Sequence, residues 1–306
     1  MRILVAGGSG LIGRALVAEL VSHGYEAVVL SRRPRDAASP GLPDGVRVAG
    51  WDGRTADGWG GLADGARAIV NLAGAGLAEG RWTPERKQII LQSRLDAGRA
   101  VVEAVQQATH RPPVVIQASG VGYYGPCGDG EVTEDAPAGS DFLARVCVEW
   151  ERSTASLSEL GVRQVVARSG LVLSRQGGSF PRLMAPFKMC VGGPLGSGRQ
   201  ALPWIHMADE VAAIRFVIET EAASGAYNLA APTPVTSRVF ARRLGRAMGR
   251  PALLPAPAFA LRLLFGEMAA VLLEGQRATP HRLLEAGFQF RFPTLDDALQ
   301  DLLVLN

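Results

Sequence analysis

The stretch that decides the fold is Met1-Arg-Ile-Leu-Val-Ala-Gly-Gly-Ser-Gly-Leu-Ile-Gly13. Residues 3–5 form a short apolar run that is typical of a buried strand, and the glycines follow at once. Residues 11–21 then place apolar side chains at helical spacing. A strand, a tight turn and a helix in this order predict a dinucleotide-binding turn, although the glycine spacing is G-x-x-G-x-x-G rather than G-x-G-x-x-G.

Three glycines of this turn have separate expected roles. Gly7 permits the sharp bend out of the strand, Gly10 lets the backbone approach a pyrophosphate, and Gly13 lets the helix pack closely on the strand. Free N–H groups at the start of the helix, together with the helix dipole, favour the anion. The alternative is a glycine-rich turn without a ligand, and the βαβ pattern that follows argues against it.

The residue types after the second predicted strand, residues 27–30, indicate which dinucleotide is bound. An acidic residue there would bind the ribose hydroxyls of NAD and repel a 2′-phosphate. The chain instead has Ser31, Arg32 and Arg33. A hydroxyl and two guanidinium groups offer charge-assisted hydrogen bonds to a phosphate, so the sequence predicts NADP(H). The alternative is that the two arginines form a solvated loop pair.

Composition limits the class of protein. The 306 residues are 47% hydrophobic and 20% charged, as in soluble globular proteins. A net charge of +3 does not predict a nucleic-acid partner and is compatible with an anionic small ligand. Three cysteines without metal-ligand spacing predict reduced thiols and no metal site. With no signal peptide and no apolar run long enough to cross a bilayer, we expect a cytoplasmic protein without a membrane partner.

Strands and helices alternate along the chain, which predicts an α/β fold with a doubly wound, mostly parallel Rossmann sheet. We expect helices over residues 84–107 and 141–160, and a strand over residues 164–172. A long, irregular, glycine-rich segment follows from about Ser174, and residues 288–292 are expected to form a small strand.

The predicted domain division follows this change of pattern. Residues 1–173, joined by about 204–230, would form the NADP-binding Rossmann domain. Residues 174–203 and 231–306 would form a smaller, mainly helical C-terminal substrate or lid domain.

The chain resembles extended short-chain dehydrogenases/reductases, whose sugar-nucleotide epimerase members share its glycine spacing and its Tyr124-Gly125 turn after a serine-bearing strand. More narrowly, it is similar to the atypical YfcH-like "epimerase family" proteins, whose C-terminal domain has no known role. The motifs that carry this likeness run over the whole chain: Asn71-Leu-Ala-Gly74, Arg81-Trp-Thr83, Ser93-Arg-Leu95, Gly122-Tyr-Tyr-Gly125, Arg168-Ser-Gly170, residues 192–200, Trp204-Ile-His206 and Gly266-Glu-Met268.

The resemblance implies NADP(H) binding and assigns roles by position. The residues that would hold the pyrophosphate are Gly7, Ser9, Gly10, Leu11 and Ile12. Ser31 and Arg32 would meet the 2′-phosphate, while Leu72 and Ala73, next to Gly74, would line the adenosine side. Arg94 occupies a helix position where extended relatives place an asparagine near the cofactor. Val172 would lie close to the nicotinamide.

The catalytic pair of ordinary short-chain dehydrogenases is missing. They use Tyr-x-x-x-Lys on the helix after the serine strand, where the lysine lowers the pKa of the tyrosine. Here that helix reads Asp141-Phe-Leu-Ala-Arg-Val-Cys-Val-Glu-Trp-Glu151, which places Leu143 and Cys147, or their preceding neighbours, at the two positions. The remaining candidates for proton transfer are Ser119, Tyr123, Tyr124, Cys147 and His206. Each also has a structural explanation, and Ser119 is one residue early if Gly120 aligns with the usual serine.

Residues 256–273 carry apolar side chains on nearly every helical turn. We expect them to pack as a lid over the substrate cleft, and a homodimer face is the alternative. The favoured function is an NADP(H)-dependent oxidoreductase acting on a small-molecule substrate. The alternatives are an NADP(H)-binding regulatory protein without turnover, and a sugar-nucleotide epimerase, which would need the missing pair.

Overall fold

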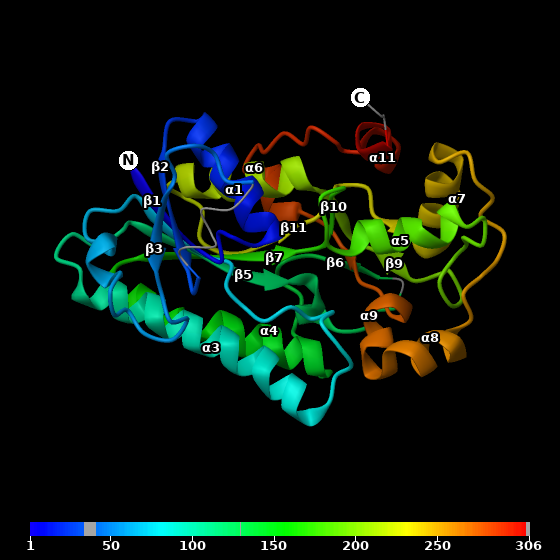
Figure 1. Cartoon of the computed structure of the whole chain (residues 1–306), viewed down its shortest axis with the longest axis horizontal. Helices are drawn as coiled ribbons and strands as arrows, with labels where there is room; N and C mark the ends of the chain where they lie inside the picture. The colour runs from blue at the N-terminus through cyan, green and yellow to red at the C-terminus, as the bar shows by residue number, and fades with distance from the viewer. Residues whose placement is uncertain (34–40, 129, 304–306) are drawn as a thin grey trace.

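The computed structural model describes residues 1–33, 41–128 and 130–303 (Figure 1). At its centre is a seven-stranded sheet with the order β11-β7-β5-β4-β1-β2-β3, in which all six pairings are parallel. These strands are β1 (Arg2–Ala6), β2 (Glu26–Ser31), β3 (Arg47–Gly50), β4 (Ala68–Asn71), β5 (Val114–Gly120), β7 (Arg163–Ser169) and β11 (Gly225–Leu229). The chain winds outward from β1 in both directions, so the predicted doubly wound Rossmann fold is confirmed.

Helices cover both faces of this sheet, which explains why its strands are almost continuously apolar. On one face lie α1 (Leu11–Ser22) and α6 (Met207–Glu219), and on the other α3 (Pro84–Gln107) and α4 (Phe142–Arg152) (Figure 1). The start of α3 is the predicted one: the Thr83 hydroxyl accepts a hydrogen bond from the Arg86 amide at 3.2 Å, and Pro84 is the first helical residue.

Shorter elements complete the chain. The helices are α5 (Ser179–Lys188), α7 (Ser237–Ala247), α8 (Ala258–Phe265), α9 (Ala270–Leu273), α10 (His281–Glu285) and α11 (Leu295–Leu303). The short strands pair as β6 (Glu131–Val132) with β13 (Arg277–Ala278), β8 (Leu171–Leu173) with β10 (Trp204–His206), and β9 (Ala201–Leu202) with β12 (Val235–Thr236). The 3₁₀ turns are η1 (Gly60–Ala63), η2 (Val121–Tyr124), η3 (Ala155–Leu160) and η4 (Gly266–Ala269). Phe187, Leu244 and Leu299 bring α5, α7 and α11 into one apolar core.

Two predicted elements end earlier than expected. The helix over 141–160 stops at Arg152, because Ser153 turns its hydroxyl back to the Trp150 carbonyl at 2.6 Å and η3 follows. The strand over 164–172 divides at Gly170. A Cβ there would lie 2.6 Å from the Pro203 carbonyl oxygen, so only glycine fits at this position. After Gly170 the chain continues as β8, which pairs with β10 instead of extending the central sheet.

Two other predictions of local structure are wrong. The segment after Ser174, which we expected to be irregular, contains the helix α5. The helix was not predicted because Pro186, a residue that usually breaks helices, lies inside it. Residues 288–292 form no strand. Their backbone N–H groups at Arg291 and Phe292 donate to the Asp209 carboxylate, at 2.7 and 3.0 Å, instead of to a neighbouring strand.

The apolar stripe over residues 256–273 is packed on one side only. Leu261 of α8 is buried, and Met268 packs on the cluster of Trp82, Ile90 and Val146. Phe259 and Leu263, in contrast, are 74% and 73% exposed. Within the described residues, no helix combines the length and apolar character that crossing a bilayer requires.

Candidate functional site

The glycine turn, residues 7–13, joins the carboxyl end of β1 to the first turn of α1. Gly7 has a φ of +76°, and a Cβ on it would lie 2.9 Å from the carbonyl carbon and oxygen of Leu72. A Cβ on Gly13 would lie 2.3 Å from the Gly7 carbonyl oxygen, so the helix packs directly on the turn. Any side chain at either position would push the turn open.

The start of α1 suits an anion. Its N-cap is Gly10, which brings no side chain, and its first turn holds no acidic residue, so side chains of the helix do not satisfy the first N–H groups. Leu11 and Ile12 are half-buried. The Leu11 side chain lies close to Gly178, since a Cβ on that glycine would be 2.9 Å from Leu11 Cδ2. The backbone of Ser9 accepts a hydrogen bond from Arg14 Nε at 2.8 Å.

The end of β2 places Ser31 and Arg32 as the sequence suggested. Ser31 is buried, and its hydroxyl oxygen accepts a hydrogen bond from the Arg33 amide at 3.1 Å. Arg32 is exposed, and its Cδ would lie 3.3 Å from a Cβ on Gly53, in the loop after β3. Residues 34–40, which follow, lie outside the part of the chain that the structure describes.

The loop after β4 runs beside the glycine turn. The Leu72 amide donates to the Ala6 carbonyl at 2.9 Å, and the Ala73 amide donates to Asn71 Oδ1 at 3.2 Å. Asn71 is fully buried and donates in turn to Gln117 Oε1 on β5 at 3.0 Å. This chain of contacts holds Leu72 and Ala73 beside Gly7.

Arg94 is a buried cation behind this loop. Its Nη1 donates to the carbonyls of Ala75 and Ile90 at 3.0 and 2.9 Å, and its guanidinium lies 4.5 Å from the centre of the Trp150 ring. A Cβ on Gly74 would lie 3.0 Å from its Cζ. Burial lowers the pKa of Arg94 to about 10, so it remains protonated at neutral pH. No carboxylate among the described residues pairs with it, and its Nε has no hydrogen-bond partner there.

A buried polar network lies at the carboxyl ends of β5 and β7. The Ser119 hydroxyl donates to Glu151 Oε1 at 2.6 Å, and Arg168 binds both oxygens of the same carboxylate at 2.9 Å. Arg168 Nη1 also donates to the Tyr124 hydroxyl at 3.0 Å. Ser119 and Tyr124 are therefore brought together, through Glu151 and Arg168, and both hydroxyls are engaged.

Tyr123 and Tyr124 have different surroundings. The buried Tyr124 hydroxyl donates to Asn228 Oδ1 at 2.7 Å, and burial raises the pKa of Tyr124 despite the nearby Arg168. Tyr123 is half-buried and packs its ring against the Arg168 guanidinium, 3.5 Å from the ring centre. Within the described residues its hydroxyl has no hydrogen-bond partner, so Tyr123 is the candidate whose phenol is free to meet a substrate.

The structure places no tyrosine or lysine on α4. Leu143 lies near Gly122, at 3.5 Å from the position of a Cβ there. Cys147 is buried, and burial raises its pKa to about 11, although hydrogen bonds with Ser119 and the Gly120 backbone act in the opposite direction. Its thiol is therefore protonated at neutral pH and is a poor nucleophile.

His206 belongs to a different set of contacts from the tyrosines. Its Nδ1 accepts the Ala208 amide at 3.1 Å as the N-cap of α6, and its Nε2 lies 3.3 Å from Asp301 on α11. Its ring packs on Phe292, and burial lowers the pKa of His206. Val172 lies in β8, paired with Ile205 of β10.

Sequence reasoning missed the roles of three acidic residues, of which Glu134 and Glu210 are buried and Glu151 is half-buried. Glu151, the last residue of the stretch 141–151 quoted above, accepts two hydrogen bonds from Arg168. Glu134 accepts the Asn228 amide at 3.0 Å. Glu210, in the first turn of α6, accepts the Ser169 hydroxyl at 2.6 Å, and burial raises its pKa to about 8. A carboxylate in an otherwise apolar helix face was the available signal for Glu210.

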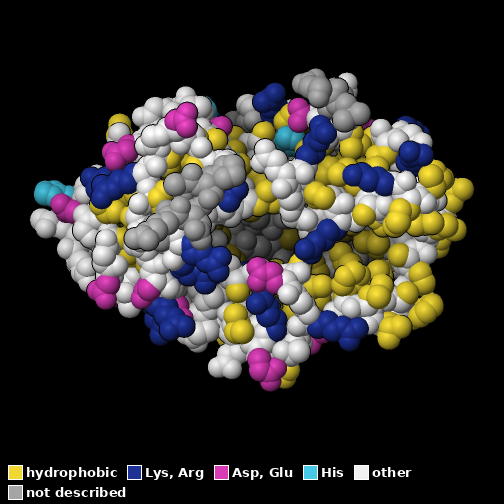
Figure 2. Space-filling view, in the orientation of Figure 1, with side chains coloured by type: hydrophobic (Ala, Val, Ile, Leu, Met, Phe, Trp, Pro, Cys, Tyr) yellow, Lys and Arg dark blue, Asp and Glu magenta, His cyan; other side chains and the backbone are white. Residues whose placement is uncertain are grey.

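The surface is hollowed near the middle of the face in Figure 2, between the part with the sheet and the part with α5, α8 and α9.

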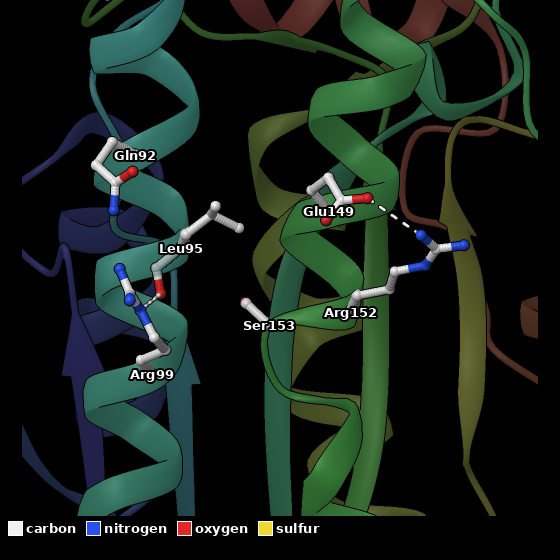
Figure 3. Close-up of a pocket in the computed structure, with 6 residues that line it drawn as sticks. All are labelled: Gln92, Leu95, Arg99, Glu149, Arg152 and Ser153. Atoms are coloured by element: carbon white, nitrogen blue, oxygen red, sulfur yellow. Dashed lines mark hydrogen bonds and ion pairs between the residues drawn. The ribbon is translucent and has the colours of Figure 1, made fainter.

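A separate shallow groove of about 310 Å³ lies between α3 and α4 (Figure 3). Two of its charged side chains, Arg99 and Arg152, pair with Asp96 and Glu149 on their own helices. This groove therefore offers little unpaired charge to a ligand.

Comparison with known proteins identifies the relatives of this chain. A model described as the NAD dependent epimerase/dehydratase family matches residues 3–230, and one for a domain of unknown function, DUF1731, matches residues 256–302. The chain is 39% identical to the epimerase family protein SDR39U1 of Mus musculus, over 98% of this chain and 99% of the relative. An epimerase family protein of Staphylococcus aureus is 36% identical, over 98% of both chains.

Solved structures of related proteins resemble this chain in fold. The crystal structure of human SDR39U1 with NADPH has a TM-score of 0.88 at 36% identity and covers 99% of both chains. The UDP-glucose 4-epimerase of Thermus thermophilus with NAD has a TM-score of 0.75 at 20% identity, which shows a shared fold alone.

Proposed function

The chain belongs to the NAD dependent epimerase/dehydratase family, and from this premise we propose that it binds NADP(H) at the glycine turn and acts as an atypical oxidoreductase on a small molecule. The observation that carries the proposal is the uncapped start of α1 behind three glycines, with Ser31 and Arg32 at the neighbouring strand end. The NADPH found with the human relative supports the same choice of cofactor.

The residues present fit this cofactor. Backbone N–H groups at the start of α1 would donate to the diphosphate, as in other Rossmann folds. Ser31 and Arg32 would meet the 2′-phosphate, and Leu72 and Ala73 would lie along the adenosine. The cofactor supplies a hydride, so the chain's own residues need only position a substrate and handle a proton.

Arg94 adds independent support. A buried cation without a carboxylate partner is costly, and a polyanionic ligand close by would offset that cost. Arg94 lies directly behind Gly74, in the loop that borders the glycine turn. We propose that Arg94 makes this edge of the sheet electropositive and so favours the phosphorylated cofactor.

For the proton, the geometry favours Tyr123 among the candidates. The hydroxyls of Ser119 and Tyr124 are held by Glu151, Arg168 and Asn228, and His206 caps α6. The phenol of Tyr123 is free to donate to a substrate oxygen.

The test combines binding and turnover. The full chain should quench and shift NADPH fluorescence on titration, and should then oxidise NADPH with at least one member of a panel of small carbonyl compounds. Tyr123→Phe should retain NADPH binding and lose turnover, whereas Tyr227→Phe, a matched change on β11, should retain both. Failure to bind NADPH while NADH binds tightly would overturn the proposal.

A second candidate is an NADP(H)-binding regulatory protein without turnover. The absence of Tyr-x-x-x-Lys on α4 and the engaged hydroxyls of Ser119 and Tyr124 favour it. NADPH binding without oxidation by any carbonyl of the panel would favour this candidate, and measured turnover would exclude it.

A further inference from the structure

Apolar side chains gather on the outer surface of the C-terminal part, on the right of Figure 2. We call this the C-terminal apolar surface. Its most exposed members come from three segments: Met189 after α5, Leu253 and Leu254 before α8, and Phe259, Leu263 and Leu264 on α8. Each is between 55% and 81% exposed. Monomeric soluble proteins rarely expose so many large apolar side chains together, so the surface calls for a partner.

The backbone behind this surface is held in place. Arg81 donates through Nε to the Leu264 carbonyl at 3.2 Å and through Nη2 to the Leu263 carbonyl. Lys87 on α3 forms an ion pair with Glu267 just after α8. These contacts fix the inner side and the C-terminal end of α8. The exposure of Leu263 and Phe259 is therefore a consequence of a fixed helix orientation and not of a loosely packed helix.

The segments that carry this surface, together with the neighbouring helix α7, are strongly basic. Residues 179–200 and 237–275 contain nine Lys or Arg and two Glu, although the whole chain has a net charge of only +3. Arg242 and Arg246 on α7, Arg250 after it and Arg262 on α8 are all exposed. Figure 2 shows dark blue side chains around the yellow surface. Of the two glutamates, Glu267 is already paired with Lys87.

We propose that the C-terminal apolar surface docks on an anionic lipid bilayer. Exposed Phe and Leu side chains on a short helix can enter the boundary between headgroups and acyl chains, while the surrounding arginines contact lipid phosphates. These side chains are more than half exposed, and a fluid bilayer can surround each of them. A second copy of the chain is disfavoured as occupant, because a twofold interface would bring the arginines of both copies together.

This inference departs from the sequence expectation of no membrane partner. That expectation rested on the lack of a spanning segment, and peripheral docking needs none. The exposure of α8 is a property of the folded chain that an apolar stripe in a sequence does not reveal.

Vesicle co-sedimentation of the full chain tests the proposal. The chain should pellet with vesicles of equimolar phosphatidylcholine and phosphatidylglycerol, much less with phosphatidylcholine alone, and less as salt is raised. Leu263→Ser should weaken binding about tenfold or more. Arg242→Gln with Arg246→Gln should weaken it roughly fivefold per arginine.

Matched variants elsewhere provide the controls. Leu284→Ser changes an exposed leucine on α10, and Arg99→Gln with Arg152→Gln neutralises two exposed arginines on α3 and α4. These should bind vesicles like the unchanged chain, and thermal melting should show that all variants are folded.

Several results would overturn the proposal. One is equal binding to anionic and to neutral vesicles. The others are an equal loss of vesicle binding in the control variants, and unchanged vesicle binding by Leu263→Ser. A dimer in sedimentation velocity that Leu263→Ser dissociates, without vesicle binding, would instead assign the surface to a second copy. Binding to polyglutamate but not to vesicles would assign it to an acidic protein.

Discussion

Arg168 and Glu151 form an ion pair with two parallel hydrogen bonds, Nε to Oε1 and Nη2 to Oε2, each 2.9 Å long. The pair is almost fully enclosed between β7 and α4, and it also takes up the hydroxyls of Ser119 and Tyr124. Two of the residues that resembled a catalytic set are therefore part of a structural network. The Tyr-x-x-x-Lys pair of ordinary short-chain dehydrogenases is absent from α4, and this network lies apart from the glycine turn, where we propose that the cofactor binds.

Glu151→Ala should lower the free energy of unfolding by about 3–5 kcal/mol, because it leaves Arg168 buried without its counterion. Glu149→Ala, on the same helix but paired with the exposed Arg152, should cost about 0–1 kcal/mol. Urea unfolding followed by circular dichroism measures both. Equal losses would show that the Arg168–Glu151 pair does not stabilise the fold.

Gly13→Ala should abolish NADPH binding and lower the melting temperature, because its methyl group would lie 2.3 Å from the Gly7 carbonyl oxygen. Gly61→Ala is the control, since a Cβ at that glycine meets no atom within 4 Å. Calorimetric titration and thermal melting of the two variants test the close approach of α1 to the turn. An unaffected Gly13→Ala variant would contradict it.

Arg32→Asp should weaken NADPH binding by about 1.5–3 kcal/mol, a tenfold to hundredfold rise in Kd, and leave NADH binding equal or stronger. The reason is that an acidic side chain repels the 2′-phosphate and suits a free ribose. Arg33→Asp should have a smaller effect, because its position is one residue further along the loop. Titration with both nucleotides separates these cases, and an Arg32→Asp variant that still prefers NADPH would refute the assignment.

Glu210 should make the protein less stable as pH rises from about 4.5 to about 8. Its pKa in the folded chain is about 8, against an ordinary 4.5, so between these values the unfolded chain loses the proton that the folded chain keeps. Below both values the two states are equally protonated and the effect vanishes.

Glu210→Gln should therefore flatten this part of the stability profile, whereas Glu221→Gln, an exposed change after α6, should leave the slope as it is. Urea unfolding across that pH range makes the comparison. A profile with the same slope in both variants would show that Glu210 is not the titrating group.

The predictable features of this chain were local. The apolar run before Gly7, the helical spacing after it, and Thr83-Pro84 at the start of α3 are signals contained in a few adjacent residues. They led to the Rossmann sheet, which the structure confirms. Ser31 and Arg32, adjacent residues after the second predicted strand, led to NADP(H), which the solved human relative supports.

Features that depend on distant partners were not predictable. The turn of the chain at Gly170 is set by Pro203, and the aromatic segment over residues 288–292 is held by Asp209 rather than by a strand. The pairing of Arg168 with Glu151 required the folded sheet to bring β7 and α4 together. The outward face of α8 likewise follows from Arg81, far away in sequence.

The central claim is that the glycine turn with Ser31 and Arg32 forms an NADP(H) site. A crystal structure of the full chain grown with NADPH tests it most directly. The account predicts the diphosphate at the N–H groups that begin α1, and the 2′-phosphate within hydrogen-bond distance of Ser31 and Arg32. A 2′-phosphate that contacts neither residue, or a nucleotide bound away from the glycine turn, would contradict it.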